Sequence, residues 1–297
     1  MSVLKFAKTR RVSRWEWLWI ASGKGLAGSQ GSEPGASRLG RRLRAVWCIV
    51  HGLGRAGEEY EISADGKIYE TQAAATKQGA TTVARICYVG NDAETNETYN
   101  HGLALALTDA NNGEIAIWCP LSHWFWTDHL CLNHHYLNKE DALRDMEGIA
   151  NTDALVASNG KEETTSTLYD DQITETHNHV AAMAARNFKY ASDVEAGTHP
   201  TGTSAWFLPS AGQWKKMIDS AGLPELDEGG HYKALRDMMG LHSEIYSVYW
   251  TSTEYVHNNG ECSSAWYFSF NGEGSFSSDN KNRGGYLDNY VRSALAF

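Results

Sequence analysis

The chain has 297 residues, of which 42% are hydrophobic and 21% charged, and this composition excludes an intrinsically disordered protein. Residues 1–55 contain eleven Lys and Arg against two Glu, a net +9, so the formal net charge of -10 leaves -19 for the rest of the chain. Because contacts to phosphate need clustered cations, the acidic main body excludes nucleic acid as its ligand.

The first 55 residues form a segment rich in Arg, Gly and Ser without a periodic apolar pattern. They could be a basic arm for nucleic acid or a membrane surface, but a flexible or artefactual extension is the better interpretation, because basic clusters without a fold motif are weak evidence for such binding. The apolar run 15–21 contains Glu16 and is too short to span a bilayer. We therefore predict neither a signal peptide nor membrane insertion.

Residues 60–120 are expected to form an amino-terminal strand and helix segment that packs against the rest of the chain. Asp65-Gly66 indicates a turn, Lys67-Ile68-Tyr69 a short strand, and 72–78 an Ala-rich helix that ends at Gly79. Two longer strands are predicted over 83–90 and over 101–107, where large and small residues alternate.

Three helices are expected in the middle of the chain. One runs from a cap at Asn138 to about Ile149, one over 179–190, and one from the capping box of Ser210 and Gln213 through Ile218. Ahead of the last helix, a strand at 206–210 carries an aromatic pair into the core.

The carboxy-terminal part has the clearest strand patterns. A strand is predicted over 247–252, and in 265–271 Trp266, Phe268 and Phe270 alternate strictly with polar residues, so the two sets face opposite sides. A closing strand over 290–297 has Val291, Leu295 and Phe297 on one face. Between these strands, 272–289 consists almost wholly of Ser, Asp, Asn, Gly and Tyr, as a surface loop would. The whole pattern predicts an α+β fold.

Four segments together carry a resemblance to a known family. They are Trp206-Phe207-Leu208-Pro209-Ser210 before a helix, Tyr249-Trp250-Thr251-Ser252-Thr253-Glu254, Ala265-Trp266 with Phe270 and Gly272, and Val291-Arg292 with Phe297. The chain here resembles the C-type-lectin-fold variable proteins of diversity-generating retroelements, which are relatives of phage tropism determinants and, distantly, of formylglycine-generating enzymes. The resemblance covers residues 172–297, and 65–113 also looks like the amino-terminal region of such proteins from gut bacteria and their phages.

The resemblance implies a C-type lectin-like domain over 121–297, with a variable region at about 250–297. In that family, reverse transcription substitutes at template adenines, so an Asn codon yields mainly Tyr, Ser, Asp, His, Gly, Asn and Arg. The candidate ligand-contact residues drawn from this set are Tyr255, His257, Asn258, Asn259, Ser263, Ser264, Tyr267, Ser269, Asn271, Ser277, Ser278, Asp279, Asn280, Asn282, Arg283, Tyr286, Asp288 and Asn289. The framework residues between them are Trp250, Trp266, Phe268, Phe270, Val291, Arg292 and Phe297.

This mixture of residues suits an exchangeable binding surface. Tyr gives large, rigid contact area, and Ser, Gly and Asn give adaptable hydrogen bonding, as in antibody loops. The alternative is an ordinary polar hairpin with a long loop. We expect a protein or glycan ligand on a cell or virion surface, and a homo-oligomer is plausible by the resemblance.

No metal or cofactor is expected. Cys119, His123, His129 and Cys131 lack the paired spacing of a zinc site, and the histidines 134, 135, 177 and 179 are expected at exposed helix ends or in loops. The calcium-dependent sugar motifs Glu-Pro-Asn and Trp-Asn-Asp are absent, although Glu273, Asp279 and Asp288 could supply carboxylates.

Catalysis is the minority hypothesis. The formylglycine-generating relatives use two reactive cysteines near the chain end, whereas only Cys262 is present in that region, without an evident base. Five cysteines without a C-x-x-C pair predict no disulfide framework. The sequence thus favours a non-enzymatic, diversified binding protein, with a fixed carbohydrate-binding lectin or adhesin as the first alternative and a formylglycine-generating-like enzyme as the second.

Overall fold

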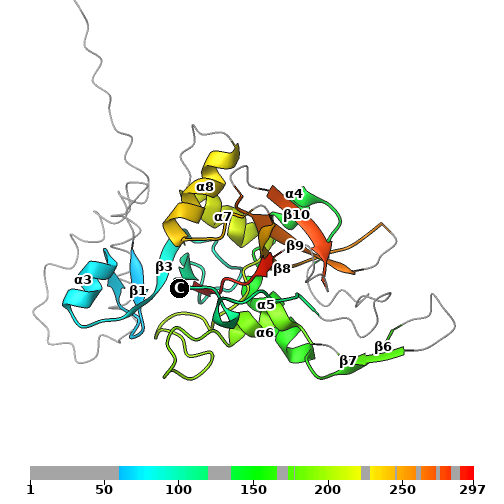
Figure 1. Ribbon diagram of the computed structural model, residues 1–297, viewed down its shortest axis with the longest axis horizontal. Helices are drawn as coiled ribbons and strands as arrows, with labels where there is room; N and C mark the ends of the chain where they lie inside the picture. Colours follow the sequence, from blue (N-terminus) through cyan, green and yellow to red (C-terminus); the bar gives the residue numbers. More distant parts are fainter. Residues whose placement is uncertain are drawn as a thin grey trace, which may run out of the picture. The chain divides into compact units, whose positions relative to one another are not determined.

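The computed structural model describes residues 60–119, 135–165, 173–176, 178–221, 228–244, 246–258, 262–271, 275–281 and 288–297. All of them fall within one unit, Val46–Phe297. The prediction for residues 1–55 lies outside the described residues. The described part is a mixed α+β structure of mainly antiparallel sheets with short helices, as the sequence predicts (Figure 1).

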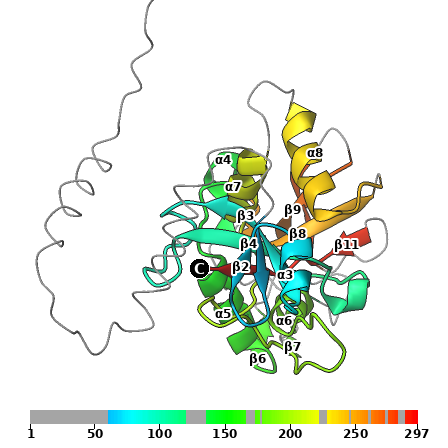
Figure 2. The same ribbon diagram turned by 90° about the vertical axis from the view of Figure 1, so that its left-hand side faces the viewer.

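The first sheet is built mostly from the amino-terminal strands that the sequence predicts. Its order is β12-β4-β3-β1-β2, where β12 is Ala294–Ala296, and every neighbouring pair is antiparallel. Figure 2 labels β2, β3 and β4 of this sheet. Helix α3 is capped by the Thr71 hydroxyl and ends before Gly79, whose φ of +70° suits glycine. The elements are β1 (Glu61–Ser63), β2 (Ile68–Tyr69), α3 (Gln72–Lys77), β3 (Thr82–Val89) and β4 (Gly102–Ala106).

The second sheet gathers the carboxy-terminal strands. Antiparallel strands follow the order β10-β9-β8, while β11 and β5 both lie parallel to β8 at different stretches of it. The polar stretch that was expected to be a loop therefore contains a six-residue edge strand, β10. The strands are β5 (His135–Tyr136), β8 (Ser247–Tyr255), β9 (Ser264–Ser269), β10 (Ser275–Asn280) and β11 (Asp288–Tyr290).

The prediction of one closing strand over 290–297 is wrong, because the chain changes sheets there. β11 pairs with β8, and after a break at 291–293 strand β12 (Ala294–Ala296) pairs with β4 of the first sheet. The other edge of β12 meets Phe207 through two backbone hydrogen bonds of 2.9 and 3.0 Å. The sequence predicts that Val291, Leu295 and Phe297 point to the same side. This prediction is confirmed, since all three belong to one hydrophobic core cluster.

The helix predicted from Asn138 to Ile149 is interrupted. Asn138 does cap a helix, but α4 (Lys139–Ala142) is a single turn, and a separate helix, α5 (Gly148–Ser158), follows. The break is fixed from outside, because the Asp145 carbonyl accepts hydrogen bonds from the Ser210 hydroxyl (2.6 Å) and the Gly212 amide (3.0 Å). That carbonyl is then unavailable for a continuous helix.

The remaining helices cover the sheets. Half of the predicted capping box is present at α7, where the Ser210 amide donates to the Gln213 side chain at 3.0 Å. Helix α6 is shorter than predicted, and α8 was not predicted. Their bounds are α6 (Val180–Arg186), α7 (Ala211–Ala221) and α8 (Glu228–Met239); a 3-10 turn, η2, covers Asn111–Gly113, and a separate hairpin joins β6 (Glu162–Thr165) to β7 (Ile173–Thr176).

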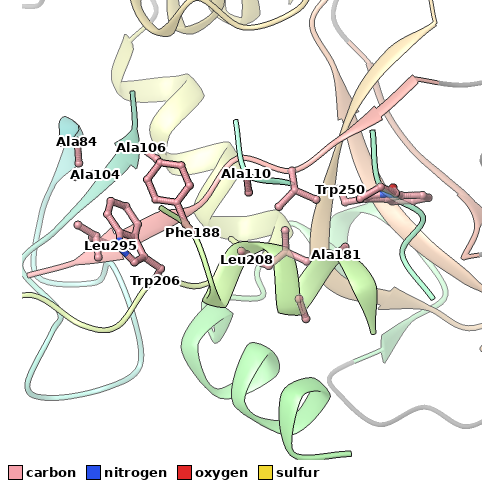
Figure 3. Packing of buried hydrophobic residues seen from close by; sticks show 14 of the residues in the cluster. Ala84, Ala104, Ala106, Ala110, Ala181, Phe188, Trp206, Leu208, Trp250 and Leu295 are labelled. Atoms are coloured by element: carbon pink, nitrogen blue, oxygen red, sulfur yellow. The ribbon is translucent and has the colours of Figure 1, made fainter. Parts of the chain in front are cut away.

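Two hydrophobic clusters form the core. The first packs α5 and α6 against the first sheet around Trp206, Leu208 and Leu295, with Phe188 edge-on to Trp206 at 4.8 Å between ring centroids (Figure 3). The second packs α7 and α8 against the second sheet around Trp214 and Phe268. Among the described helices, none has the length and apolar character needed to cross a bilayer.

Candidate ligand-binding surface

Nine of the candidate contact residues reach the surface of the carboxy-terminal sheet or the segments beside it. Asn258, Asn271 and Ser277 are exposed, and six others are half-buried. We call these nine the contact surface: Tyr255, His257, Asn258, Tyr267, Asn271, Ser277, Ser278, Asp279 and Asn280. They come from the end of β8, from β9 and from β10.

Strand register places three contact residues of β9 and β10 on one face, whereas Ser278 and Asn280 lie on the other face with Trp266. Tyr267 lies directly opposite Ser277, and Asp279 opposite Ala265, so Tyr267, Ser277 and Asp279 share one face. Burial raises the pKa of Tyr267, while its hydrogen bond with Ser277 works in the opposite direction. The phenol therefore stays neutral at physiological pH and can both donate and accept a hydrogen bond.

The opposite face of these strands is a packed aromatic layer. Trp266 stacks on Phe276 with centroids 4.6 Å apart and planes at 14°, and Phe268 lies 4.6 Å from the same ring. Tyr255 meets the edge of Trp266 at 5.1 Å. The predicted alternation of Trp266 and Phe268 with Tyr267 is thus confirmed, and each of these aromatic rings contributes several kcal/mol when buried.

Four candidate contact residues are buried, so the expectation of a wholly exposed set is wrong for them. Ser263, Ser264, Ser269 and Asn289 are at most 9% exposed. Ser269 donates to the Ser247 carbonyl at 3.3 Å, because β9 is paired on both sides and its small side chain lies against a neighbouring strand. We therefore leave these four positions out of the contact surface.

The other candidates cannot be placed on the surface. Asn259, Asn282, Arg283 and Tyr286 lie outside the described residues. The backbone of Asp288 belongs to β11, where it pairs with Ser247.

A buried ion pair between the end of β10 and β8 was not predicted. Lys281, directly after β10, pairs with Glu254 of β8, and neither side chain is exposed. The ammonium also lies 4.7 Å from the centroid of Trp118. The Lys281 amide donates to the Ser263 carbonyl (3.1 Å), and its own carbonyl accepts from the Cys119 amide (3.0 Å). Its only sequence signal is a Lys inside an otherwise Ser, Asp and Asn-rich stretch.

The histidines and cysteines do not form a metal site in the described part of the chain, where no group of three or more metal-binding side chains occurs. His123, His129, Cys131, His134 and His177 lie outside the described residues. His135 is exposed as expected, whereas His179 is fully buried at the start of α6, edge-on to Trp118 at 5.3 Å. The expectation of an exposed His179 is therefore wrong.

Cys262 is not the lone thiol that the sequence suggested, because it is disulfide-bonded. Neither Cys87 nor Cys119 forms a disulfide, both are buried, and burial raises the pKa of Cys87 to about 12. Thiolate is the reactive form of cysteine, so Cys87 is unreactive at neutral pH. Neither cysteine has the features of an activated nucleophile.

Comparison with known proteins gives no relative to set beside this geometry. No family model, no curated protein and no solved structure matches the chain.

Proposed function

We propose that the chain is a ligand- or receptor-binding variable protein with a C-type lectin-like fold, whose second sheet displays a diversified contact surface. The single observation that carries this proposal is the division of burial along β8, β9 and β10. The framework residues Trp250, Trp266, Phe268, Phe270, Val291, Arg292 and Phe297 are at most 7% exposed, whereas nine of the thirteen candidate contact residues with a described side chain are exposed or half-buried.

Such a division lets side chains change without loss of the fold. Substitutions at exposed positions usually change stability by no more than about 0.5 kcal/mol, while truncation of a buried aromatic ring costs about 3–5 kcal/mol. The chemistry of the contact surface also favours recognition, since Tyr255, Tyr267, Asn258 and Asn271 combine rigid aromatic area with adaptable amides. We propose no catalytic role, and the disulfide of Cys262 is consistent with this.

Two matched libraries of the full chain test whether the fold tolerates changes of side chain at the contact surface. The first randomises Asn258, Asn271, Ser277, Ser278 and Asn280 among Tyr, Ser, Asp, His, Gly, Asn and Arg. The second applies the same set to five buried framework positions: Trp250, Trp266, Phe268, Phe270 and Val291. We expect most members of the first library to resist protease and almost none of the second. Equal losses in both libraries would contradict an exchangeable surface.

The diversification of the contact surface is tested on the encoding DNA. We expect a near-copy of the segment for residues 250–297 that differs mainly at adenines, together with a reverse transcriptase gene. A complete flanking sequence with neither feature would leave a static binding domain. Binding is then sought by selecting the first library on intact bacterial cells, where enriched clones should differ at the contact surface.

A further inference from the structure

A cleft that shares no residue with the contact surface lies where the segment after β4 faces α6. Its volume is about 1060 Å³, and Arg292 and Gly240 close one side. We propose that this cleft is a second binding site, which takes one ring of a neutral saccharide.

The base of the cleft is apolar. Leu107, Val180, Met183 and Ala184 line it and are half-buried. Ala181 of α6 and Phe188, which follows α6 and also lines the cleft, belong to the first core cluster (Figure 3). A base of methyl and methylene groups suits the C–H face of a sugar ring, which loses little hydration when it is covered.

Four neutral amides are among the exposed residues that line the cleft. Asn111, Asn112, Asn178 and Asn187 all line the cleft and are exposed. Asn111 donates to the Ile115 carbonyl at 3.1 Å, while within the described part of the chain the amide side chains of the other three make no hydrogen bond. An amide offers two donors and an acceptor in one plane, so it can bind two neighbouring hydroxyls at once.

The backbone of two of these Asn residues is unusual. Asn111 and Asn112 have φ of +55° and +57°, and they are the only non-glycine residues with positive φ among the described residues. Asn tolerates this left-handed region better than most residues, yet such conformations cost about 1–3 kcal/mol and concentrate at ligand sites. Here the conformation belongs to the turn η2, which holds these two amides at the cleft.

The charged groups at the back of the cleft are already paired, which argues against an ionic ligand. Asp109 accepts from Arg292 at 2.6 Å and from the Tyr249 hydroxyl at 3.3 Å, and it lies 3.2 Å from His242. Arg292 also donates to the Ala106 carbonyl at 3.0 Å. Among the charged residues that line the cleft, only Lys189 is exposed. A single ammonium group at the surface contributes little to the binding of an anionic ligand.

The test uses the full chain with methyl-labelled Met and a panel of neutral methyl glycosides of glucose, galactose and N-acetylglucosamine. We expect at least one glycoside to shift the Met183 methyl signal in a saturable way. Asn112→Gly removes the amide while keeping a residue that accepts φ of +57°, and Asn187→Ala removes a second amide. Each variant should weaken binding about five- to tenfold, with the melting temperature as a control for folding.

Asn271→Ala on the contact surface is the matched control and should leave glycoside binding unchanged. The proposal is overturned if no neutral glycoside shifts the Met183 signal, or if binding survives in both cleft variants. It is also overturned if only a sialylated saccharide binds and Lys189→Gln abolishes that binding, because the ligand would then be anionic. Loss of cell binding by contact-surface variants with glycoside binding intact would separate the two sites.

Discussion

Lys281 and Glu254 form an ion pair from which solvent is fully excluded, between the end of β10 and β8, two strands that carry the contact surface. The pair joins the end of β10 to β8, and Trp118 lies over the ammonium. Isolated buried charges are strongly unfavourable, so each member of the pair depends on the other.

We therefore expect Lys281→Met to reduce the free energy of unfolding by about 3–5 kcal/mol, because it removes the ammonium that faces the buried Glu254 carboxylate. The double variant Lys281→Met with Glu254→Leu should recover most of this loss. Urea unfolding measures both. Lys215→Met, which breaks the exposed pair with Asp219, is the matched control and should change stability by less than about 1 kcal/mol. If Lys281→Met were as stable as this control, the buried ion pair would not contribute to stability, and the prediction would be wrong.

The aromatic layer gives a second expectation. Phe268→Ala should cost about 3–5 kcal/mol, because Phe268 is fully buried against Phe276 and Trp214. Ser277→Ala, in the strand paired with it, should stay within about 0.5 kcal/mol because Ser277 is exposed. Thermal unfolding of the two variants measures the difference. Similar losses would show that β10 is held by its polar side chains instead.

Gly212 in α7 provides a test of close packing between segments. A Cβ at this position would lie 2.3 Å from the Asp145 carbonyl oxygen, so Gly212→Ala should destabilise the protein even though Ala is the better helix former by about 1 kcal/mol. Ser220→Ala, at an exposed position of the same helix, should be neutral or slightly stabilising. The comparison is made by urea unfolding, and a stabilising Gly212→Ala would refute the contact.

The burial of Glu94 predicts that the free energy of unfolding depends on pH. Its burial raises the pKa, against hydrogen bonds from Ile149, Thr95 and Gln213 that lower it. Since the folded-state pKa is above the unfolded value, the folded state binds more protons in this range, and the stability that Glu94 contributes is lost as pH rises above about 4.5. We expect the stability of the wild type relative to Glu94→Gln to fall between pH 4 and pH 7. If the unfolding free energies of the wild type and of Glu94→Gln changed with pH in the same way, the raised pKa of Glu94 would be contradicted.

Local patterns predicted the elements whose signals lie within them. The alternation of Trp266, Phe268 and Phe270 and the Gly79 stop of α3 each describe a short stretch and are confirmed, and the capping box of Ser210 and Gln213 is confirmed in part. The burial of Trp206 and Phe207 was predicted in the same way.

The missed elements depend on distant partners. Asn151 and Thr152 are polar, yet both are buried in α5, because Asn151 donates to Asp145 and Thr152 exchanges hydrogen bonds with the Leu208 backbone. The sheet change after Tyr290 is set by β8 and β4, far away in sequence. For the candidate site, residue type alone could not distinguish the exposed Ser277 from the buried Ser269. Ser277 lies on the edge strand β10, whereas Ser269 lies on β9, which is paired on both sides.

The last ten residues join both sheets, since β11 adds to β8 and β12 adds to β4 some 190 positions earlier. Neither sheet reaches its final order before residues 288–297 have been synthesised. Contacts of such long sequence separation slow folding, because loop closure must precede the gain from pairing. Until residues 288–297 are synthesised, β8 and β4 each keep an unpaired strand edge, and such edges make folding intermediates prone to aggregation.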